Sequence, residues 1–197
     1  MKKFNWTEVS APNKFLPAGA YVIEIQDVID NEDWEQVEII YNVIEGEHKD
    51  IYKNLGPEDD WKHKFTRKYD DRNERRFKEF LDELEHDNPS FSIERWQVDS
   101  DPLKFAGLKM GVLLGEWRSI YQDRETGEDK ASSKLILSKP LTIEQVRNGE
   151  WDTPDPVYKR GTDDLMWLEL RADNAPSTST TAATEQTSVY DDDIPFV

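Results

Sequence analysis

Cysteine is absent from the 197 residues, which excludes disulfides and zinc sites built on thiolates. Only three histidines occur, His48, His63 and His86, so a metal site would have to depend on carboxylates. The sequence has no run of about 18 apolar residues, and its amino terminus lacks the apolar stretch of a secretory signal. These absences favour a cytoplasmic protein with no metal, no cofactor and no membrane partner.

Positive charge is scarce as well. The chain has 25 Lys and Arg against 42 Asp and Glu, which gives a net charge of -17. Such a balance favours solubility and argues against general attraction to nucleic acid or to an anionic membrane. The sequence also lacks a Gly-rich phosphate loop, an H-E-x-x-H motif and a G-x-S-x-G motif, so we do not expect an enzyme.

The composition changes after Arg171. Residues 172–190 are mostly Ala, Ser and Thr, with no Lys or Arg. A stretch of this kind cannot bury enough apolar surface to offset the entropy lost on ordering. We therefore expect one domain over 1–171, a flexible linker over 172–190 and a separate terminal peptide over 191–197.

The body has the pattern of a mainly β protein. Apolar and polar residues alternate in several segments, and the acidic DNED at 30–33 is typical of a hairpin turn. The turn between the last two strands is expected at Thr126-Gly127. Five strands are predicted, at 19–28, 34–44, 51–55, 108–121 and 133–138.

Two helices are expected between and after these strands. The first covers 71–88, with Phe77, Phe80, Leu81 and Leu84 on one face, Asp70 or Asp71 as its N-cap, and Asn88-Pro89 as its end. The second begins in a capping box, Thr142 to Gln145, and ends at Gly149. Five strands with a helix between the third and fourth favour a small Greek-key barrel of the OB type. A β-sandwich with appended helices is the alternative.

One segment is basic in this acidic chain. Residues 61–78 hold eight bases and three acids, a net charge of +5, and aromatic residues are interspersed among them. Cations can bind the phosphates of a single nucleic-acid strand, and rings can stack on its bases for roughly 1–3 kcal/mol each. The alternative is a basic solvated surface leading into an amphipathic helix.

Rings on the fourth expected strand could extend such a surface. Trp117 and Tyr121 share one face of that strand, and Lys130 and Lys134 follow across the turn. Packing in the core is the alternative for any single ring. The candidate residues for contact with single-stranded DNA are Trp61, Lys62, Lys64, Phe65, Arg67, Lys68, Trp117 and Tyr121.

The terminal peptide joins acidic and apolar residues. Asp191, Asp192 and Asp193 precede Ile194-Pro195-Phe196, with Val197 last. Apolar side chains beyond a linker are stabilised only when something binds them, so this pattern indicates a short motif for an apolar pocket ringed by Lys and Arg.

This peptide resembles the C-terminal tip of bacterial single-stranded DNA-binding proteins. The resemblance implies an OB-fold core, a disordered linker, a tip that recruits replication, recombination and repair enzymes of the host, and self-association. Because the body is unlike that of the bacterial proteins, the chain looks like a bacteriophage-encoded member that uses the host's tip. Val197 departs from the pattern, since it displaces the terminal carboxylate by one residue.

We therefore expect a sequence-tolerant protein that coats and protects single-stranded DNA in phage replication and recombination. The alternatives are an acidic adaptor or DNA mimic that captures host proteins without binding DNA, a strand-annealing recombination mediator, and a metal-dependent nuclease.

Overall fold

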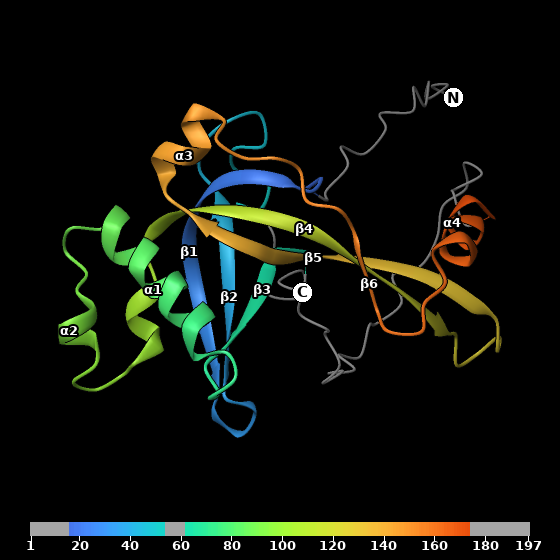
Figure 1. Ribbon diagram of the computed structural model, residues 1–197, viewed down its shortest axis with the longest axis horizontal. Coiled ribbons are helices and arrows are strands. Elements are labelled where there is room, and N and C mark those ends of the chain that lie inside the picture. Colours follow the sequence, from blue (N-terminus) through green and yellow to red (C-terminus); the bar gives the residue numbers. More distant parts are fainter. Residues whose placement is uncertain (1–15, 54–61, 174–197) are drawn as a thin grey trace, which may run out of the picture. The chain divides into compact units, whose positions relative to one another are not determined.

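The computed structural model describes residues 16–53 and 62–173 (Figure 1). The fold is a mainly antiparallel sheet of six strands with a few helices. The described chain forms two compact units. The first unit takes residues 16–53, 62–115 and 135–154, and the second takes 116–134 and 155–173.

Five of the strands follow one another across the sheet in the order β3-β2-β1-β4-β5, and β6 pairs with β4. The strands are β1 (Gly19–Asn31), β2 (Gln36–Val43), β3 (Lys64–Lys68), β4 (Lys109–Gln122), β5 (Asp129–Leu141) and β6 (Val157–Tyr158).

The first two strands form the hairpin that the alternation predicts. Side chains alternate across a strand, and the odd-numbered residues of β2, from Val37 to Val43, are buried in the core together with Ile23 and Ile25 of β1. The turn between the strands is a single 3-10 turn, η1 (Glu32–Trp34), followed by Glu35 in the left-handed region at φ 48°. The pairing register shifts between Ile25 and Asp27.

The prediction of a third strand at 51–55 is wrong. Residues 51–53 form turns, in which the N–H of Ile51 bonds the oxygen of His48 and the N–H of Lys53 bonds the oxygen of Asp50. Residues 54 and 55 lie outside the described residues. The strand that pairs with β2 is β3, which lies further along the chain in the basic segment.

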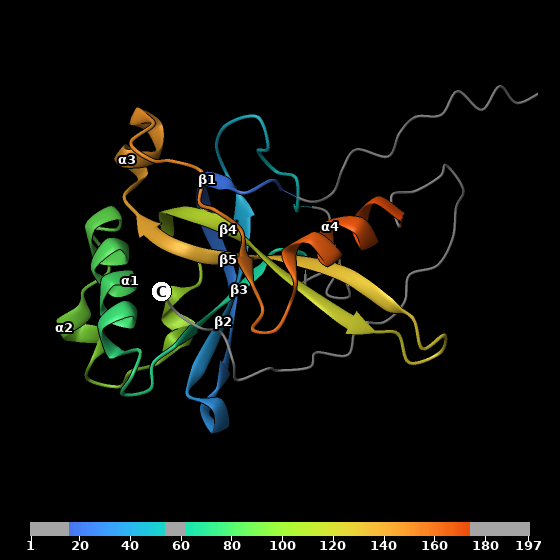
Figure 2. The same ribbon diagram turned by 45° about the vertical axis from the view of Figure 1, so that its right-hand side comes forward.

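Helix α1 (Glu74–Asp87) confirms the predicted helix, and its four predicted apolar residues are buried. Its N-cap is Asn73, not Asp70 or Asp71. The carboxylate of Asp70 instead accepts hydrogen bonds from the backbone N–H groups of Arg72 and Asn73, which forms a turn before the helix. Figures 1 and 2 both show α1 alongside the part of the sheet that contains β1.

Two short elements follow α1 that the sequence does not predict, because four residues are too few for a helical period. They are α2 (Ile93–Trp96) and η3 (Pro102–Phe105). They bring an aromatic cluster together, in which the Phe105 ring lies 5.5 Å from that of Trp96 and 5.9 Å from those of Phe80 and Phe91.

Helix α3 (Ile143–Asn148) has the predicted capping box, in which Thr142 and Gln145 exchange hydrogen bonds, and it ends at Gly149 with φ 69°. The same turn explains Gly111 on β4. A Cβ at that position would lie 2.5 Å from the backbone oxygen of Thr142, so only glycine fits there.

The second unit contains the outer ends of β4 and β5, strand β6 and helix α4 (Asp164–Asp173). Helix α4 extends two residues into the predicted linker, and the rest of the linker and the terminal peptide lie outside the described residues. Trp167 anchors this helix, since its indole is buried and its N–H donates to the backbone oxygen of Ser132 at 3.0 Å. In Figure 2, α4 lies beside the β4–β5 hairpin of its own unit.

Candidate nucleic-acid interface

Strand β3 carries four of the eight predicted binding residues and divides them between two faces. Its side chains alternate, so Lys64, Thr66 and Lys68 lie on one face and Phe65 and Arg67 on the other. In the register with β2, Lys68 is opposite Gln36, Thr66 is opposite Glu38 and Lys64 is opposite Ile40. The polar face is defined here by Gln36, Glu38, Ile40 and Asn42 of β2 and Lys64, Thr66 and Lys68 of β3.

The structure corrects the expectation for Phe65. It is buried in the core opposite Ile39, and its ring centroid lies 5.6 Å from that of Tyr41. A base cannot stack on a ring that the core already covers. Trp61, the other ring predicted in the basic segment, lies outside the described residues.

Arg67 also lies on the core side of β3. Its Nε atom is buried and has no hydrogen-bond partner among the described residues. Burial lowers the pKa of its guanidinium to about 10, and the nearby charge of Arg76 acts in the same direction. Only the outer nitrogens of this guanidinium could therefore meet a phosphate.

An ion pair lies on the polar face. The Lys64 ammonium is 2.6 Å from the carboxylate of Glu38, which is itself 3% exposed. The side-chain amide of Asn31 donates to the other oxygen of that carboxylate at 3.3 Å. Lys64 is thus held beside a buried negative charge, and Lys62 and Lys68 are the partly exposed lysines on either side of it.

Two side-chain amides on the polar face each have one atom without a hydrogen-bond partner among the described residues. Gln36 and Asn42 are 4% and 6% exposed. The Nε2 atom of Gln36 and the Oδ1 atom of Asn42 are buried without a hydrogen-bond partner among the described residues. Buried polar atoms of this kind usually have partners, so these two call for a ligand or for water.

The predicted residues of the second unit differ in exposure. Trp117 is 9% exposed, and the Lys134 ammonium lies 4.7 Å from the centroid of its ring. Tyr121 is 44% exposed. Lys130 forms an ion pair with Asp123. That contact is the main reason why the pKa of Asp123 lies well below its usual range. Of the two rings predicted in this unit, Tyr121 is therefore the exposed one, and its contact with DNA stays a prediction.

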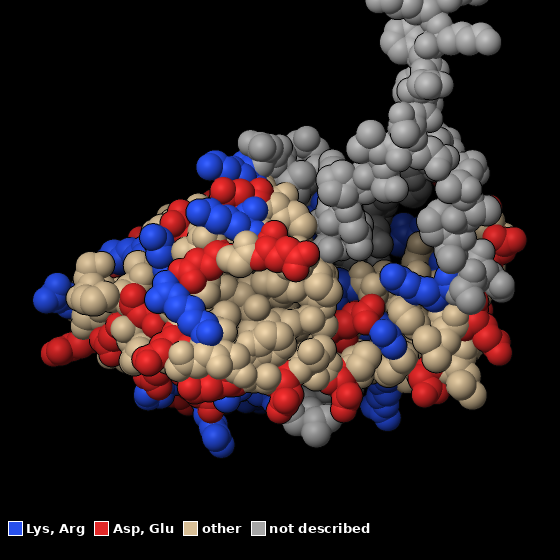
Figure 3. All heavy atoms as spheres, turned by 90° about the horizontal axis from the view of Figure 1, so that it is seen from above, with Lys and Arg blue, Asp and Glu red and all other residues tan. Residues whose placement is uncertain are grey.

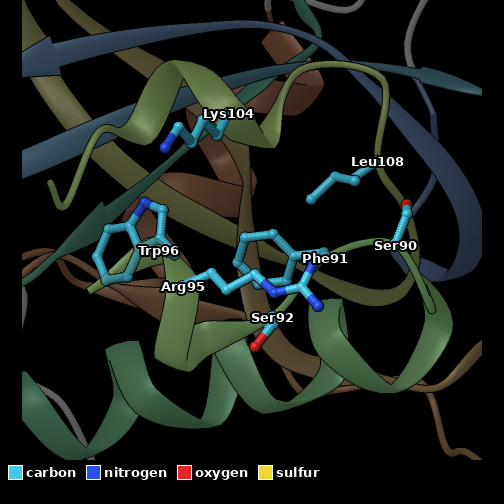
Figure 4. Close-up of a pocket in the computed structure, with 7 residues that line it drawn as sticks. All are labelled: Ser90, Phe91, Ser92, Arg95, Trp96, Lys104 and Leu108. Atoms are coloured by element: carbon cyan, nitrogen blue, oxygen red, sulfur yellow. The ribbon is translucent and has the colours of Figure 1, made fainter. Parts of the chain in front are cut away.

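The first unit contains a pocket that the sequence analysis does not predict (Figure 4). Its volume is about 250 Å³, and it is lined by the apolar residues Phe91, Trp96 and Leu108 and by polar residues that include Arg95 and Lys104. Lys104 already pairs with Asp99 at 2.5 Å. The pocket contains no residue of the predicted DNA-binding set.

One face of the described molecule has mixed charge. Figure 3 shows acidic and basic side chains interspersed over one face of the molecule. Within residues 16–53 and 62–173 we find no group of three or more His, Asp or Glu side chains placed to hold a metal ion. No helix in that part of the chain is long and apolar enough to cross a membrane.

Comparison with known proteins adds no family. No protein-family model matches the chain, and no curated protein is significantly similar to it. The functional conclusion therefore depends on the residues described above and on the resemblance of the terminal peptide.

Proposed function

We propose that this protein binds single-stranded DNA without strong sequence preference, and that it coats and protects the strand during phage replication and recombination. The observation that carries the proposal is β3, a short basic strand in an acidic chain. Its two lysines, Lys64 and Lys68, are partly exposed and lie on the opposite face of the strand from the buried Phe65. A groove of cations is what the phosphates of a single strand require.

The order of the strands supports this reading. Strands β1, β2 and β3 form a meander, α1 follows β3, and β4 returns to pair with β1. An OB fold has this order, and it binds nucleic acid on the face of its second and third strands. We infer an OB-type barrel with the polar face of β2 and β3 as its binding surface. The pairing of β3 with β5 that would close the barrel is not found among the described strands.

The terminal peptide gives the protein its second role in this proposal. Asp191, Asp192 and Asp193 would bind a basic rim on a host replication, recombination or repair enzyme, and Ile194, Pro195 and Phe196 would fill its apolar pocket. This role, and self-association of the chain, follow from the resemblance to bacterial single-stranded DNA-binding proteins.

A fluorescence titration tests the DNA-binding proposal. We expect oligo-dT to quench tryptophan fluorescence while a duplex of equal length does not. With about 4–6 phosphates bound, log affinity should fall with log salt at a slope of about -3 to -4, because each contact with a single strand contributes about -0.7. Absence of any response to the single strand would overturn the proposal.

Charge reversal identifies the surface. Lys62→Glu with Lys68→Glu should weaken binding at least tenfold at moderate salt. The matched control is Lys139→Glu with Arg160→Glu, which reverses two other exposed charges, one on β5 and one after β6. Equal effects of the double variant and the control would show that only net charge matters and would remove β3 from the proposal.

The net charge of -17 favours one alternative, an acidic adaptor that captures host proteins without touching DNA. A pulldown with the full chain separates the two functions. Capture of host repair enzymes with no binding of a single strand in the titration would favour the adaptor.

A further inference from the structure

The ion pair of Glu38 and Lys64 indicates that different residues of the polar face contact the bases and the phosphates of a bound strand. We infer that this pair contacts the edges of nucleobases, and that the phosphates of a bound strand are neutralised by other cations. The inference rests on the proposed function and names the chemical group that this part of the site recognises: a base with an exocyclic amino group.

The position of the charges is the first argument. The carboxylate of Glu38 lies 2.6 Å from the Lys64 ammonium, so a phosphate that approached Lys64 would also approach a negative charge. An ammonium already neutralised in this way does not neutralise a phosphate, so it releases none of the cations condensed on the strand. Lys64 is therefore a poor phosphate contact, although it lies on the basic strand.

The unused hydrogen-bonding atoms are the second argument. The Nε2 atom of Gln36 and the Oδ1 atom of Asn42 are buried on the same face as Glu38, two and four residues away along β2. A donor, a carboxylate and an acceptor in one row match the mixed donors and acceptors on base edges, whereas a phosphate offers acceptors alone. Thr66, opposite Glu38, is exposed, so the row opens to solvent there.

The carboxylate sets the preferred base. Asp and Glu accept hydrogen bonds from the amino group of cytosine, and adenine carries an amino group as well. Thymine presents two carbonyl oxygens on either side of one N–H, and these oxygens are unfavourable beside a carboxylate. We expect oligo-dC to bind three- to tenfold more tightly than oligo-dT of equal length.

Salt dependence distinguishes a base contact from a phosphate contact. Lys64→Met should weaken binding of oligo-dC five- to tenfold at every salt concentration and leave the slope of log affinity against log salt unchanged. The matched comparison is Lys68→Met, on the same strand and face: removal of a cation that neutralises one phosphate makes that slope less steep by about 0.7.

Glu38→Gln should change the slope of log affinity against log salt in the opposite direction to the removal of a phosphate contact. It removes the charge that neutralises Lys64, so the ammonium becomes available to phosphate. The slope should become steeper by about 0.7, and the preference for oligo-dC should disappear. A purely structural pair that only joins β2 to β3 would change neither the slope nor the ranking of bases. Circular dichroism confirms that each variant is folded.

The outcomes separate the two proposals. If the unmodified protein binds no single strand, both fail. If it binds, but Lys64→Met makes the slope less steep by about 0.7 or oligo-dT binds as tightly as oligo-dC, the proposed function stands and the base-edge inference is overturned. Should Lys64→Met fail to fold, Glu38→Gln alone decides, because an unchanged slope in that variant contradicts the inference.

Discussion

The guanidinium of Arg118 lies over the indole ring of Trp167, with 4.3 Å between its central carbon and the ring centroid. The same guanidinium bonds the carboxylate of Glu116 at 2.6 Å and the hydroxyl of Tyr158 at 2.8 Å. Residues from β4, β6 and α4 thus meet at one side chain. The second unit has its own small core, although its strands belong to hairpins and edges that would be marginal in isolation.

We expect Trp167→Ala to unfold this unit selectively. Truncation of a buried Trp costs about 3–5 kcal/mol, and here it also removes the hydrogen bond to Ser132 and the contact with Arg118. Limited proteolysis and hydrogen exchange should show loss of protection in 116–134 and 155–173. Leu168→Ala, on the next and exposed residue, should change stability by less than about 0.5 kcal/mol. Equal protection in the two variants would contradict the assignment.

Gly111→Ala should destabilise the first unit. The added Cβ would lie 2.5 Å from the Thr142 oxygen and 2.8 Å from a methyl group of Val146, and the backbone of the capping turn cannot move without loss of α3. Overpacking of this kind costs about 1–3 kcal/mol, which urea unfolding can measure. Gly19→Ala on β1 is the control, because its nearest contact would be an ordinary 3.5 Å. A midpoint that is the same in both variants would refute this account of Gly111.

The sequence predicts the parts of the fold that repeat a pattern. The alternation in β1 and β2 and the spacing of Phe77, Phe80, Leu81 and Leu84 in α1 reflect burial on one face, which a period of 2 or 3.6 makes visible. The capping box of α3 is visible for a different reason, since both of its side chains lie within one turn. Strand β3 cannot be predicted in this way. Its sequence, KFTRK, contains only one apolar residue, so it shows no repeated alternation of apolar and polar residues.

The site is less predictable than the fold. Charge counting finds the basic segment, but it does not show that Lys64 is neutralised by a residue 26 positions earlier. That contact depends on the register of β2 and β3, which tertiary packing sets. The burial of Phe65 cannot be predicted for the same reason. Its position opposite Ile39 follows from the strand pairing and not from its neighbours in sequence.

Substitution of Tyr121 and substitution of Phe65 should have opposite effects on stability and on DNA binding. Tyr121 is exposed, so Tyr121→Ala should leave the unfolding midpoint unchanged; if its ring stacks on a base, binding of oligo-dT weakens by about 1–3 kcal/mol. Phe65→Ala should destabilise the fold by about 3–5 kcal/mol, and binding by the folded fraction should be unaltered. The comparison needs urea unfolding and fluorescence titration of both variants. Loss of binding in folded Phe65→Ala protein would restore that ring to the binding surface.

The hydroxyl of Tyr69 donates a hydrogen bond to the carboxylate of Asp30 at 3.0 Å. Burial, that hydrogen bond and the negative charge of Asp30 raise the pKa of Tyr69 to about 12. The folded protein therefore keeps a proton that the unfolded chain loses near its ordinary value of about 10. The resulting stabilisation is complete below pH 10 and decreases as the pH rises through about 12.

Urea unfolding at a series of pH values tests this linkage. Between pH 10 and about 12 the free energy of unfolding should fall less steeply in Tyr69→Phe than in the unmodified protein, because the variant has no phenol to titrate. Asp30→Asn should have an intermediate slope, since it keeps the phenol but removes the charge that disfavours tyrosinate. Identical slopes in all three proteins would mean that Tyr69 titrates alike in the folded and unfolded chains, and the bond to Asp30 would then have no energetic role at high pH.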